Sequence, residues 1–339
     1  MRKGTNPEKS KTTIEIEHYH RVIVPVYIPH FNGYFEQLLD IFQLCLESLL
    51  LTSHAKTRIT IYNNNSHPDV KNYIDSMYQK NEMIDQVFHS KENLGKINAY
   101  LTATKGNIEP LITITDADVL FKNGWQEAVE SLFIGFPEAG MISPVPLSNT
   151  PWTFTANNWF YALFKGKLKF EKVLDPEAMS RFYVSLDNDK PLYNKTHLEK
   201  YLVLKNKKSS AVMGCGHFVA TLKREVIDLG TNKPSFHKID SNIENLYIDA
   251  PNEALGFLRL ATKNNYAYHM GNQTEPWMYE EFKSIKKNTF AGVNIKQIGN
   301  TKIGKFGNLI GRVIIKLLRV KIIKKNVLIY LGMKKGINY

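Results

Sequence analysis

Two carboxylates separated by a single residue form the part of this sequence best suited to chemistry. Asp116 and Asp118 directly follow the apolar stretch 111–115 (LITIT), whose composition predicts a buried strand. In open α/β sheets, ligands bind where loops leave the carboxyl ends of the strands. Two carboxylates at such an edge can hold Mn²⁺ or Mg²⁺, and the cation can in turn bind a diphosphate. The alternative is a solvated turn, because Asp is frequent in turns.

The chain before this motif alternates between short apolar stretches and longer stretches with helical periodicity. We predict strands and helices in turn, namely strands at 21–27, 58–62, 84–88 and 111–115 and helices at 33–51, 70–78 and 93–104. This alternation predicts an α/β fold whose mixed, mostly parallel sheet is flanked by helices on both faces.

The second half of the chain has a less regular pattern. Aromatic and charged residues mix without a clear period after about residue 145, which indicates an inserted, helical segment. Regularity returns with a strand at 217–222, a helix at 251–262 and a strand at 266–270. We therefore expect five parts: a flexible N-terminus (1–20), a first half (21–145), an inserted helical and aromatic segment (146–212), a second half of the same domain (213–281) and a basic amphipathic C-terminal region (282–339).

Composition excludes several classes of protein. The 339 residues are 43% hydrophobic and 22% charged, which is typical of a globular chain rather than a disordered one. Two cysteines, Cys45 and Cys215, are too few for a disulfide framework or a thiolate zinc site, which favours a reducing compartment. We find neither a signal peptide nor an apolar run of roughly 18 residues, so we expect a cytoplasmic protein without a spanning helix.

The positive charge is concentrated in the C-terminal region. Residues 282–339 contain 14 Lys and Arg and no Asp or Glu, although the whole chain has a net charge of only +12. Within 309–319, three basic residues share one helical face and five apolar residues the other, namely Arg312, Lys316 and Arg319 against Ile310, Val313, Ile314, Leu317 and Leu318. This pattern predicts a helix lying on an anionic membrane surface. A helix packed on the domain is the alternative, and nucleic acid is disfavoured because 309–319 contains no aromatic residue that could stack on bases.

Four motifs in order give the chain a resemblance to a known family. They are VIVPVY at 22–27, IYNNNS at 61–66, ENLGKINAY at 92–100 and ITDADV at 114–119. Together they resemble the GT-A nucleotide-sugar-binding half of family 2 inverting glycosyltransferases of the kind that build bacterial cell-surface polysaccharides. The resemblance implies a Rossmann-related GT-A fold, a nucleoside-diphosphate-sugar donor, Mn²⁺ or Mg²⁺, and sugar transfer with inversion.

The resemblance also implies roles for particular residues. Pro25 and Tyr27 would line the nucleotide pocket, and Asp116 would bind the donor together with the metal. Asn63 stands where the family usually has an Asp that helps to hold the base, which leaves the identity of the nucleotide open. Three further residues would let the backbone approach the nucleotide, namely Asn93, Gly95 and Asn98.

The resemblance requires a carboxylate that accepts the proton of the acceptor hydroxyl. The family usually carries it in a Glu-Asp pair at the start of a helix, but the matching segment here offers Asp249 and Glu253 instead. Asp249 could alternatively be only a helix N-cap. His269 stands where some relatives have a third metal ligand, and imidazole suits Mn²⁺. A histidine at the end of a strand can equally be a plain hydrogen-bonding residue.

These observations predict a metal-assisted glycosyltransferase. Its partners would be a nucleoside-diphosphate sugar, a glycan or lipid-linked oligosaccharide acceptor and, through the C-terminal region, the anionic inner face of the cell membrane. Two alternatives stay open. One is a sugar nucleotidyltransferase, although no Gly-rich basic loop follows the first strand. The other is a catalytically degenerate, glycan-binding relative, which Asn63 and the missing Glu-Asp pair favour.

Overall fold

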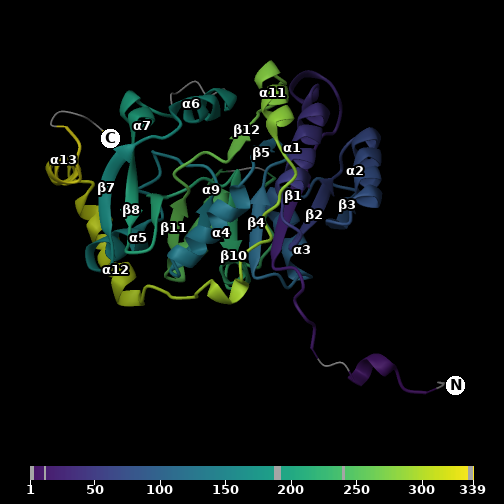
Figure 1. The fold of residues 1–339 in the computed structure, drawn as a ribbon, viewed down its shortest axis with the longest axis horizontal. Helices are drawn as coiled ribbons and strands as arrows, with labels where there is room; N and C mark the ends of the chain where they lie inside the picture. The colour runs from purple at the N-terminus through teal and green to yellow at the C-terminus, as the bar shows by residue number, and fades with distance from the viewer. Residues whose placement is uncertain (1–3, 11–12, 187–191, 239–240, 335–338) are drawn as a thin grey trace.

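One ten-stranded sheet runs through the molecule in the computed structural model, which describes residues 4–10, 13–186, 192–238, 241–334 and 339 (Figure 1). From one edge to the other its strands are β3 (Ile84–Ser90), β2 (Thr57–Asn64), β1 (His20–Val26), β4 (Leu111–Thr115), β10 (Val219–Lys223), β6 (Ala139–Ser143), β11 (Leu258–Ala261), β9 (Ser210–Met213), β8 (Lys200–Lys205) and β7 (Lys167–Lys172). Strands β10, β9 and β7 run opposite to the others. The predicted mixed, mostly parallel sheet is confirmed.

The parallel half of the sheet follows directly from its apolar strands. β1 pairs with β2 on one side and with β4 on the other, and all three strands run in the same direction. Val22, Ile23 and Val24 are fully buried because helices cover both faces of the sheet. Strands buried on both faces need continuous apolar runs, which is the pattern seen here. The carboxyl ends of β1, β2 and β4 therefore meet at one edge.

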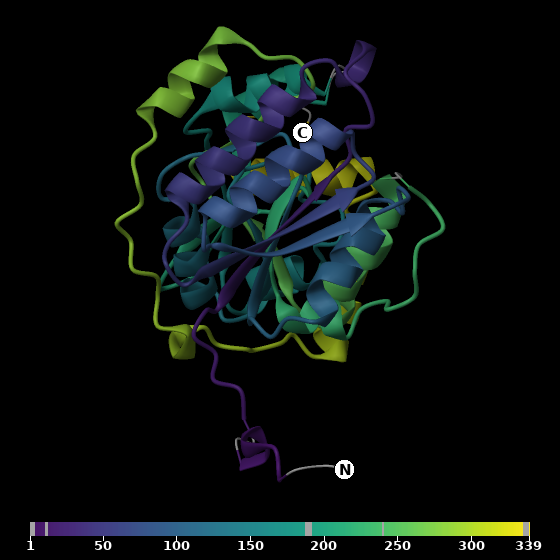
Figure 2. The same ribbon diagram turned by 90° about the vertical axis from the view of Figure 1, so that its right-hand side faces the viewer.

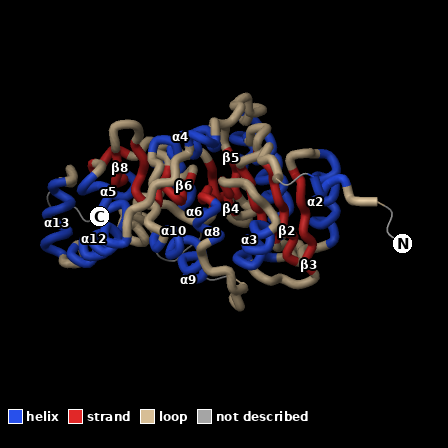
Figure 3. The backbone as a smooth tube through the Cα atoms, turned by 90° about the horizontal axis from the view of Figure 1, so that it is seen from below, coloured by secondary structure: helices blue, strands red, loops and turns tan. Residues whose placement is uncertain are grey.

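Helices lie on both sides of the sheet, and Figure 3 shows α4 on one side and α3, α8 and α9 on the other. The α-helices are α1 (Leu38–Thr52), α2 (Pro68–Lys80), α3 (Lys96–Lys105), α4 (Trp125–Gly135), α5 (Ala156–Phe164), α6 (Pro176–Ser185), α7 (Lys195–Glu199), α8 (Arg224–Asp228), α9 (Ser241–Glu244), α10 (Ala250–Ala254), α11 (Pro276–Ser284), α12 (Lys305–Leu317) and α13 (Lys321–Tyr330). Short turns of other helix types complete the set, namely η1 (Pro7–Ser10), η2 (Gly33–Phe35), the π-helical η3 (Asn245–Asp249) and η4 (Ile295–Gln297). The helices that flank the sheet enclose its apolar core.

A small second sheet places the last strand next to the Asp116–Asp118 loop. It pairs β5 (Val119–Phe121) with β12 (Ala267–His269) in antiparallel register, so that His269 lies opposite Val119. The backbone N–H of Met270 donates to the carbonyl of Asp118 at 2.8 Å. His269 and Val119, 150 positions apart in the chain, are thereby fixed side by side.

Residues 285–304 connect α11 to α12 as an extended segment, which we call the C-terminal strap. Figure 2 shows it in yellow-green, running down the outside of the molecule and along the edge where the strands begin. Backbone hydrogen bonds attach it to distant parts of the domain, including Asn288 N–H to the Leu51 carbonyl (2.7 Å) and Ile303 N–H to that of Gly256 (2.8 Å). The strap therefore carries the chain to the far end of the sheet.

Two expectations from the sequence need correction in the second half. The predicted helix at 251–262 is wrong, because α10 ends at Ala254 and β11 occupies Leu258–Ala261. β11 is buried on both faces between β6 and β9, so its sequence lacks the alternation that marks a half-buried strand. The segment 146–212 is not purely helical either: β7, β8 and the first residues of β9 extend the main sheet there.

The basic region forms two helices beside β7 and β8, at the end of the sheet where α5 also lies (Figures 1 and 3). The predicted helix is present as α12, and the segment after Val320 forms a second helix, α13. α12 packs on α5 so closely that a Cβ at Gly311 would lie 1.9 Å from the Ala156 carbonyl oxygen. Among the described residues, no helix is both long and apolar enough to cross a membrane.

The apolar residues of α12 serve two different purposes. Ile314 and Leu318 pack inward, in a cluster with Trp159 and Phe170. Another set faces outward at helical spacing and forms what we call the apolar stripe, with exposed fractions of 75% at Phe306, 59% at Leu309, 48% at Val313 and 49% at Leu317. The face predicted as uniformly apolar is thus divided between the domain and the surface.

Candidate functional site

Asp116, Asp118 and His269 come together at the carboxyl edge of the sheet. One ligand atom from each lies within 4.8 Å of the other two, and all three residues are partly buried. The backbone N–H of Asp116 donates to the Phe218 carbonyl at 2.7 Å, which fixes the loop after β4. His269 Nε2 is 3.4 Å from Asp118 Oδ2, and its Nδ1 is 2.9 Å from Ser185 Oγ. The predicted ligand set therefore converges on one point.

The chemistry of this Asp–His cluster fits a divalent cation. Asp118 Oδ1 is buried and has no hydrogen-bond partner among the described residues, so one carboxylate oxygen is free to coordinate. Carboxylate oxygens suit Mg²⁺ and Mn²⁺, and imidazole suits Mn²⁺ in addition. Burial raises the pKa of Asp116 to about 6, against the opposing effect of Lys96 and with a contribution from Asp118. Asp116 and Asp118 would hold the cation, and His269 would complete the set.

Lys96 lies beside this cluster and joins it to a further carboxylate. Its Nζ contacts Asp116 Oδ1 and is 2.5 Å from Glu244 Oε1. Lys96 is the first residue of α3, and Glu244 is the last residue of α9. Sequence reasoning did not single out either residue.

Glu244 begins a chain of charged contacts that leads into the core. Its Oε2 is 3.5 Å from His217 Nδ1, and His217 Nε2 contacts Asp249 Oδ2. Arg259 Nε is 2.7 Å from Asp249 Oδ1, an ion pair without hydrogen-bond alignment. Glu244 and Asp249 reach the same imidazole because η3 is a π-helical turn, in which residues five apart approach one face.

The two predicted proton acceptors lie in very different surroundings. Asp249 is fully buried between His217 and Arg259, so an acceptor molecule cannot reach it. Glu253 caps α5 instead: its Oε2 accepts the Ala156 backbone N–H at 2.9 Å, and its Oε1 is 3.7 Å from Arg312. The structure therefore does not bring Glu253 to the Asp–His cluster, and it gives Asp249 only an indirect connection through His217.

The residues expected to bind the donor lie at the same edge of the sheet, but most of their polar groups are already engaged. Pro25 pairs with Tyr62, and the next residue, Val26, pairs with Asn63. Asn63 is 3% exposed, accepts the Ser66 N–H at 2.9 Å through Oδ1 and is 3.0 Å from His89 Nδ1 through Nδ2. Tyr27 is 37% exposed at the end of β1. Tyr27 is therefore the most accessible of these residues.

Asn93, Gly95 and Asn98 build the start of α3 rather than an open surface. Asn93 Oδ1 accepts the Gly95 N–H at 2.9 Å, and Asn98 exchanges two hydrogen bonds of 2.8 Å with the backbone of Ser235. Gly95 has φ +84°, and a Cβ there would lie 2.7 Å from the Lys238 carbonyl oxygen. The absence of a Cβ at Gly95 thus accommodates the Lys238 backbone, and an approach of the Gly95 backbone to a nucleotide stays a prediction.

Comparison with known proteins identifies the family. The sequence model described as "Glycosyl transferase family 2" matches residues 25–224, which is more than half of the chain. The chain belongs to glycosyl transferase family 2. The matched region contains the last two residues of β1, all of β2 to β4, the Asp116–Asp118 pair and His217. Among curated proteins, no match to this family 2 chain was found.

Two solved structures are similar to this family 2 chain at low identity. One is the mannosyltransferase PcManGT from Pyrobaculum calidifontis in complex with GDP-Man and Mn²⁺, with 14% identity, a TM-score of 0.41, and coverage of 72% of this chain and 54% of that chain. The other is S. aureus TarS 1–349, with 12% identity, a TM-score of 0.41, and coverage of 78% and 62% respectively. The family 2 chain thus spans less than two thirds of either structure.

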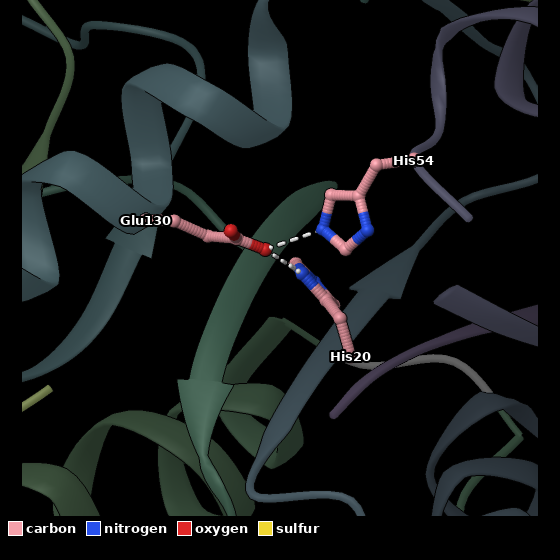
Figure 4. Close-up of side chains that lie close together, drawn as sticks. All are labelled: His20, His54 and Glu130. Carbon is pink, nitrogen blue, oxygen red and sulfur yellow. Dashed lines mark hydrogen bonds and ion pairs between the residues drawn. The ribbon is translucent and has the colours of Figure 1, made fainter. Parts of the chain in front are cut away.

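A second group of potential ligands lies at the opposite edge of the sheet in this family 2 chain. Figure 4 shows His20 and His54 pointing at one oxygen of Glu130, at 2.7 Å and 2.9 Å. All three residues are fully buried, and the Tyr19 hydroxyl donates to the other carboxylate oxygen at 2.8 Å. These donor–acceptor distances are those of ordinary hydrogen bonds, so this buried His–Glu cluster is a hydrogen-bonded element of the core.

Three residues of the site were missed or undervalued from the sequence. Glu244 and Lys96 were not considered, and His217 was regarded as a strand residue. A usable signal for Glu244 exists, because it lies in the first turn of the continuous helical stretch 241–254 that precedes β11. If 258–261 is recognised as a strand, the helix before it must end before Leu258. Its helical pattern then extends back beyond Pro251 to Glu244.

Proposed function

We propose that this chain transfers a sugar from a nucleoside-diphosphate sugar to a glycan or lipid-linked acceptor, with inversion at the anomeric carbon. The observation that carries the proposal is the convergence of Asp116, Asp118 and His269 at the carboxyl edge of the sheet in a family 2 chain. A bound Mn²⁺ or Mg²⁺ would offset the negative charge of the leaving diphosphate. Asp116, Asp118 and His269 would hold that ion.

The acceptor hydroxyl must lose its proton during the displacement. Its oxygen forms a bond to the anomeric carbon while the bond from that carbon to the diphosphate oxygen breaks, and the diphosphate leaves with the electron pair. We assign the role of proton acceptor to Glu244. Its carboxylate is 19% exposed and shares the Lys96 ammonium group with Asp116, whereas Asp249 is fully buried. Asp249 then acts through His217, and Glu253 has a structural role.

The C-terminal region supports association with an anionic membrane. The apolar stripe of α12 has no cover among the described residues, and Arg312, Lys316 and Arg319 are exposed beside it. Exposed apolar side chains flanked by cations suit the interface of an anionic bilayer. A membrane location at the inner face of the cell envelope would suit a lipid-linked acceptor and the biosynthesis of polysaccharide.

Thermal stability with Mn²⁺ and a panel of nucleoside diphosphates tests the donor site. We expect one diphosphate to raise the melting temperature only when Mn²⁺ is present, and Asp118→Asn to abolish that response. Asp69→Asn is the matched control, because Asp69 is an exposed acidic residue of α2; this variant should respond like the wild type. An unchanged response in Asp118→Asn would contradict the site.

Turnover distinguishes the proposal from its two alternatives. A glycosyltransferase releases nucleoside diphosphate from a donor sugar in the presence of Mn²⁺. A nucleotidyltransferase would instead release pyrophosphate from a nucleoside triphosphate and a sugar phosphate. A degenerate relative would show the Mn²⁺-dependent stabilisation without either reaction.

A further inference from the structure

Lys96 places a positive charge between two carboxylates of the proposed site. Its ammonium group contacts Asp116 and lies 2.5 Å from Glu244, and the Lys96 side chain is only 22% exposed. The ring of Tyr100, one turn further along α3, lies 5.8 Å from the same nitrogen. The ammonium group is thus surrounded by groups that favour its charged form.

The start of α3 holds Lys96 firmly in this position. Gly95 is the N-cap residue, and the Lys238 backbone packs against it, within 2.7 Å of the position that a Cβ would take. The Lys96 N–H also donates to the Lys238 carbonyl at 3.4 Å. Because this backbone is fixed on both sides, only the flexible side chain of Lys96 can change partners.

The site carries more negative than positive charge without that ammonium group. Asp116, Asp118 and Glu244 supply three carboxylates within a partly buried region, and unpaired charges there are costly. Burial lowers the pKa of Lys96, but Asp116, Tyr100 and Glu244 outweigh it and hold that pKa well above its ordinary value. The charged Lys96 therefore occupies Asp116 Oδ1, an oxygen atom that a divalent cation could otherwise bind.

We propose that Lys96 is an exchangeable counter-ion of the metal site. It neutralises Asp116 in the free protein and so weakens the binding of a divalent cation, until a nucleoside diphosphate provides another anionic partner for the ammonium group. The inference rests on the proposed function. It requires positive coupling between the cation and the diphosphate, because each favours the state in which Lys96 has left Asp116.

Direct binding of Mn²⁺, followed by electron paramagnetic resonance of the free ion, tests the proposal without turnover. We expect Lys96→Met to bind Mn²⁺ at least about tenfold more tightly than the wild type when no nucleotide is present. We expect UDP or GDP to tighten Mn²⁺ binding in both proteins, and by a clearly larger factor in the wild type, because only there must Lys96 also leave Asp116. Equal or weaker Mn²⁺ binding by Lys96→Met would overturn the proposal.

Three further variants make the result specific. Lys105→Met removes the same charge from the exposed end of the same helix and should bind Mn²⁺ like the wild type. Lys96→Arg retains the charge and should do the same. Asp118→Asn separates the two hypotheses: if it leaves Mn²⁺ binding intact, the metal site itself is wrong, whereas a loss there with no change in Lys96→Met contradicts only the role of Lys96.

The proposal can still be tested if Lys96→Met fails to fold. Lys96→Gln is the second substitution, because it keeps the length and polarity of the side chain. Should both variants unfold, the Mn²⁺ affinity of the wild type with and without UDP and GDP can still refute the proposal. Mn²⁺ affinity that changes less than about threefold with either nucleotide would overturn the proposal.

Discussion

His217 contacts the fully buried carboxylate of Asp249 through its Nε2 atom. The proton on this nitrogen satisfies a charge that solvent cannot reach, which fixes the plane of the ring. The other ring nitrogen then faces Glu244 at 3.5 Å. Asp249 can therefore influence the site only by orienting His217, whereas Glu244 is the carboxylate that solvent can reach.

Glu244→Gln should lower turnover more than Asp249→Asn. Loss of the proton acceptor is expected to reduce kcat by roughly 10²-fold or more while the affinity for nucleoside diphosphate is retained. Asp249→Asn should reduce kcat less and should also lower the melting temperature, because Arg259 then keeps a buried charge without its partner. Steady-state kinetics and thermal unfolding of both variants check this order, and the reverse order would restore Asp249 as the base.

Acid should destabilise the protein partly through Glu130. Burial raises the pKa of Glu130, but hydrogen bonds from His20 and His54 outweigh it and lower the pKa to about 2. The unfolded chain therefore binds a proton more readily, so this stabilisation is complete above about pH 4.5 and is lost as the pH falls towards 2. The lost free energy of unfolding is about 3 kcal/mol.

Glu130→Gln should be less stable than the wild type at pH 7 and should lose less of its remaining stability between pH 5 and pH 3. Urea unfolding at several pH values measures the difference. Glu127→Gln, an exposed residue on the same helix α4, is the matched control and should keep the acid sensitivity of the wild type. Identical pH profiles for Glu130→Gln and the wild type would contradict the assignment.

Gly311→Ala should separate α12 from α5. The added Cβ would lie 1.9 Å from the Ala156 carbonyl oxygen, and a backbone atom cannot move aside as a side chain can. Overpacking of this kind typically costs about 1–3 kcal/mol. Gly304→Ala is the control, because a Cβ at that position has no described atom within 4 Å. Thermal unfolding should therefore distinguish two glycines only seven residues apart, and equal melting temperatures would argue against the tight packing.

Replacing Phe306, Leu309 and Val313 by Ser should weaken membrane binding without unfolding the domain. These side chains are exposed, so their loss costs little stability but removes apolar area that would enter the bilayer interface. Co-sedimentation with phosphatidylglycerol-containing vesicles, compared with pure phosphatidylcholine, measures the effect. Leu229→Ser, at a residue 61% exposed outside the basic region, should bind like the wild type. If the wild type ignores anionic vesicles at low salt, the membrane proposal fails.

The parallel half of the fold could be predicted because its strands carry continuous β-branched runs and its helices have clear periodicity. Leu258–Ala261 could not be recognised, since a four-residue strand buried on both faces has no alternation to display. The helix predicted at 251–262 also left out Glu244, which precedes it, while the family resemblance pointed to Asp249 and Glu253. Asp116 and Asp118 could be predicted because they directly follow an apolar strand, whereas His269 was predicted from the family resemblance.

Other features depend on tertiary contacts that no local pattern encodes. The basic residues of the C-terminal region were visible, but the division of the apolar side chains of α12 into an inward and an outward set depends on Gly307 and Gly311 meeting α5. Likewise, Lys96 gains its significance from Glu244, a residue 148 positions later in the chain.

The position of β11 inside the sheet, between β6 and β9, determines which fragments of the chain can fold stably. The family match ends at residue 224, yet β11 pairs with β6 on one side and with β9 on the other. A fragment cut at the end of the match would leave two unpaired strand edges in the middle of the sheet, where aggregation begins. During synthesis, the two parts of the sheet can be joined only after Ala261 has left the ribosome, so the edges of β6 and β9 remain unpaired until then.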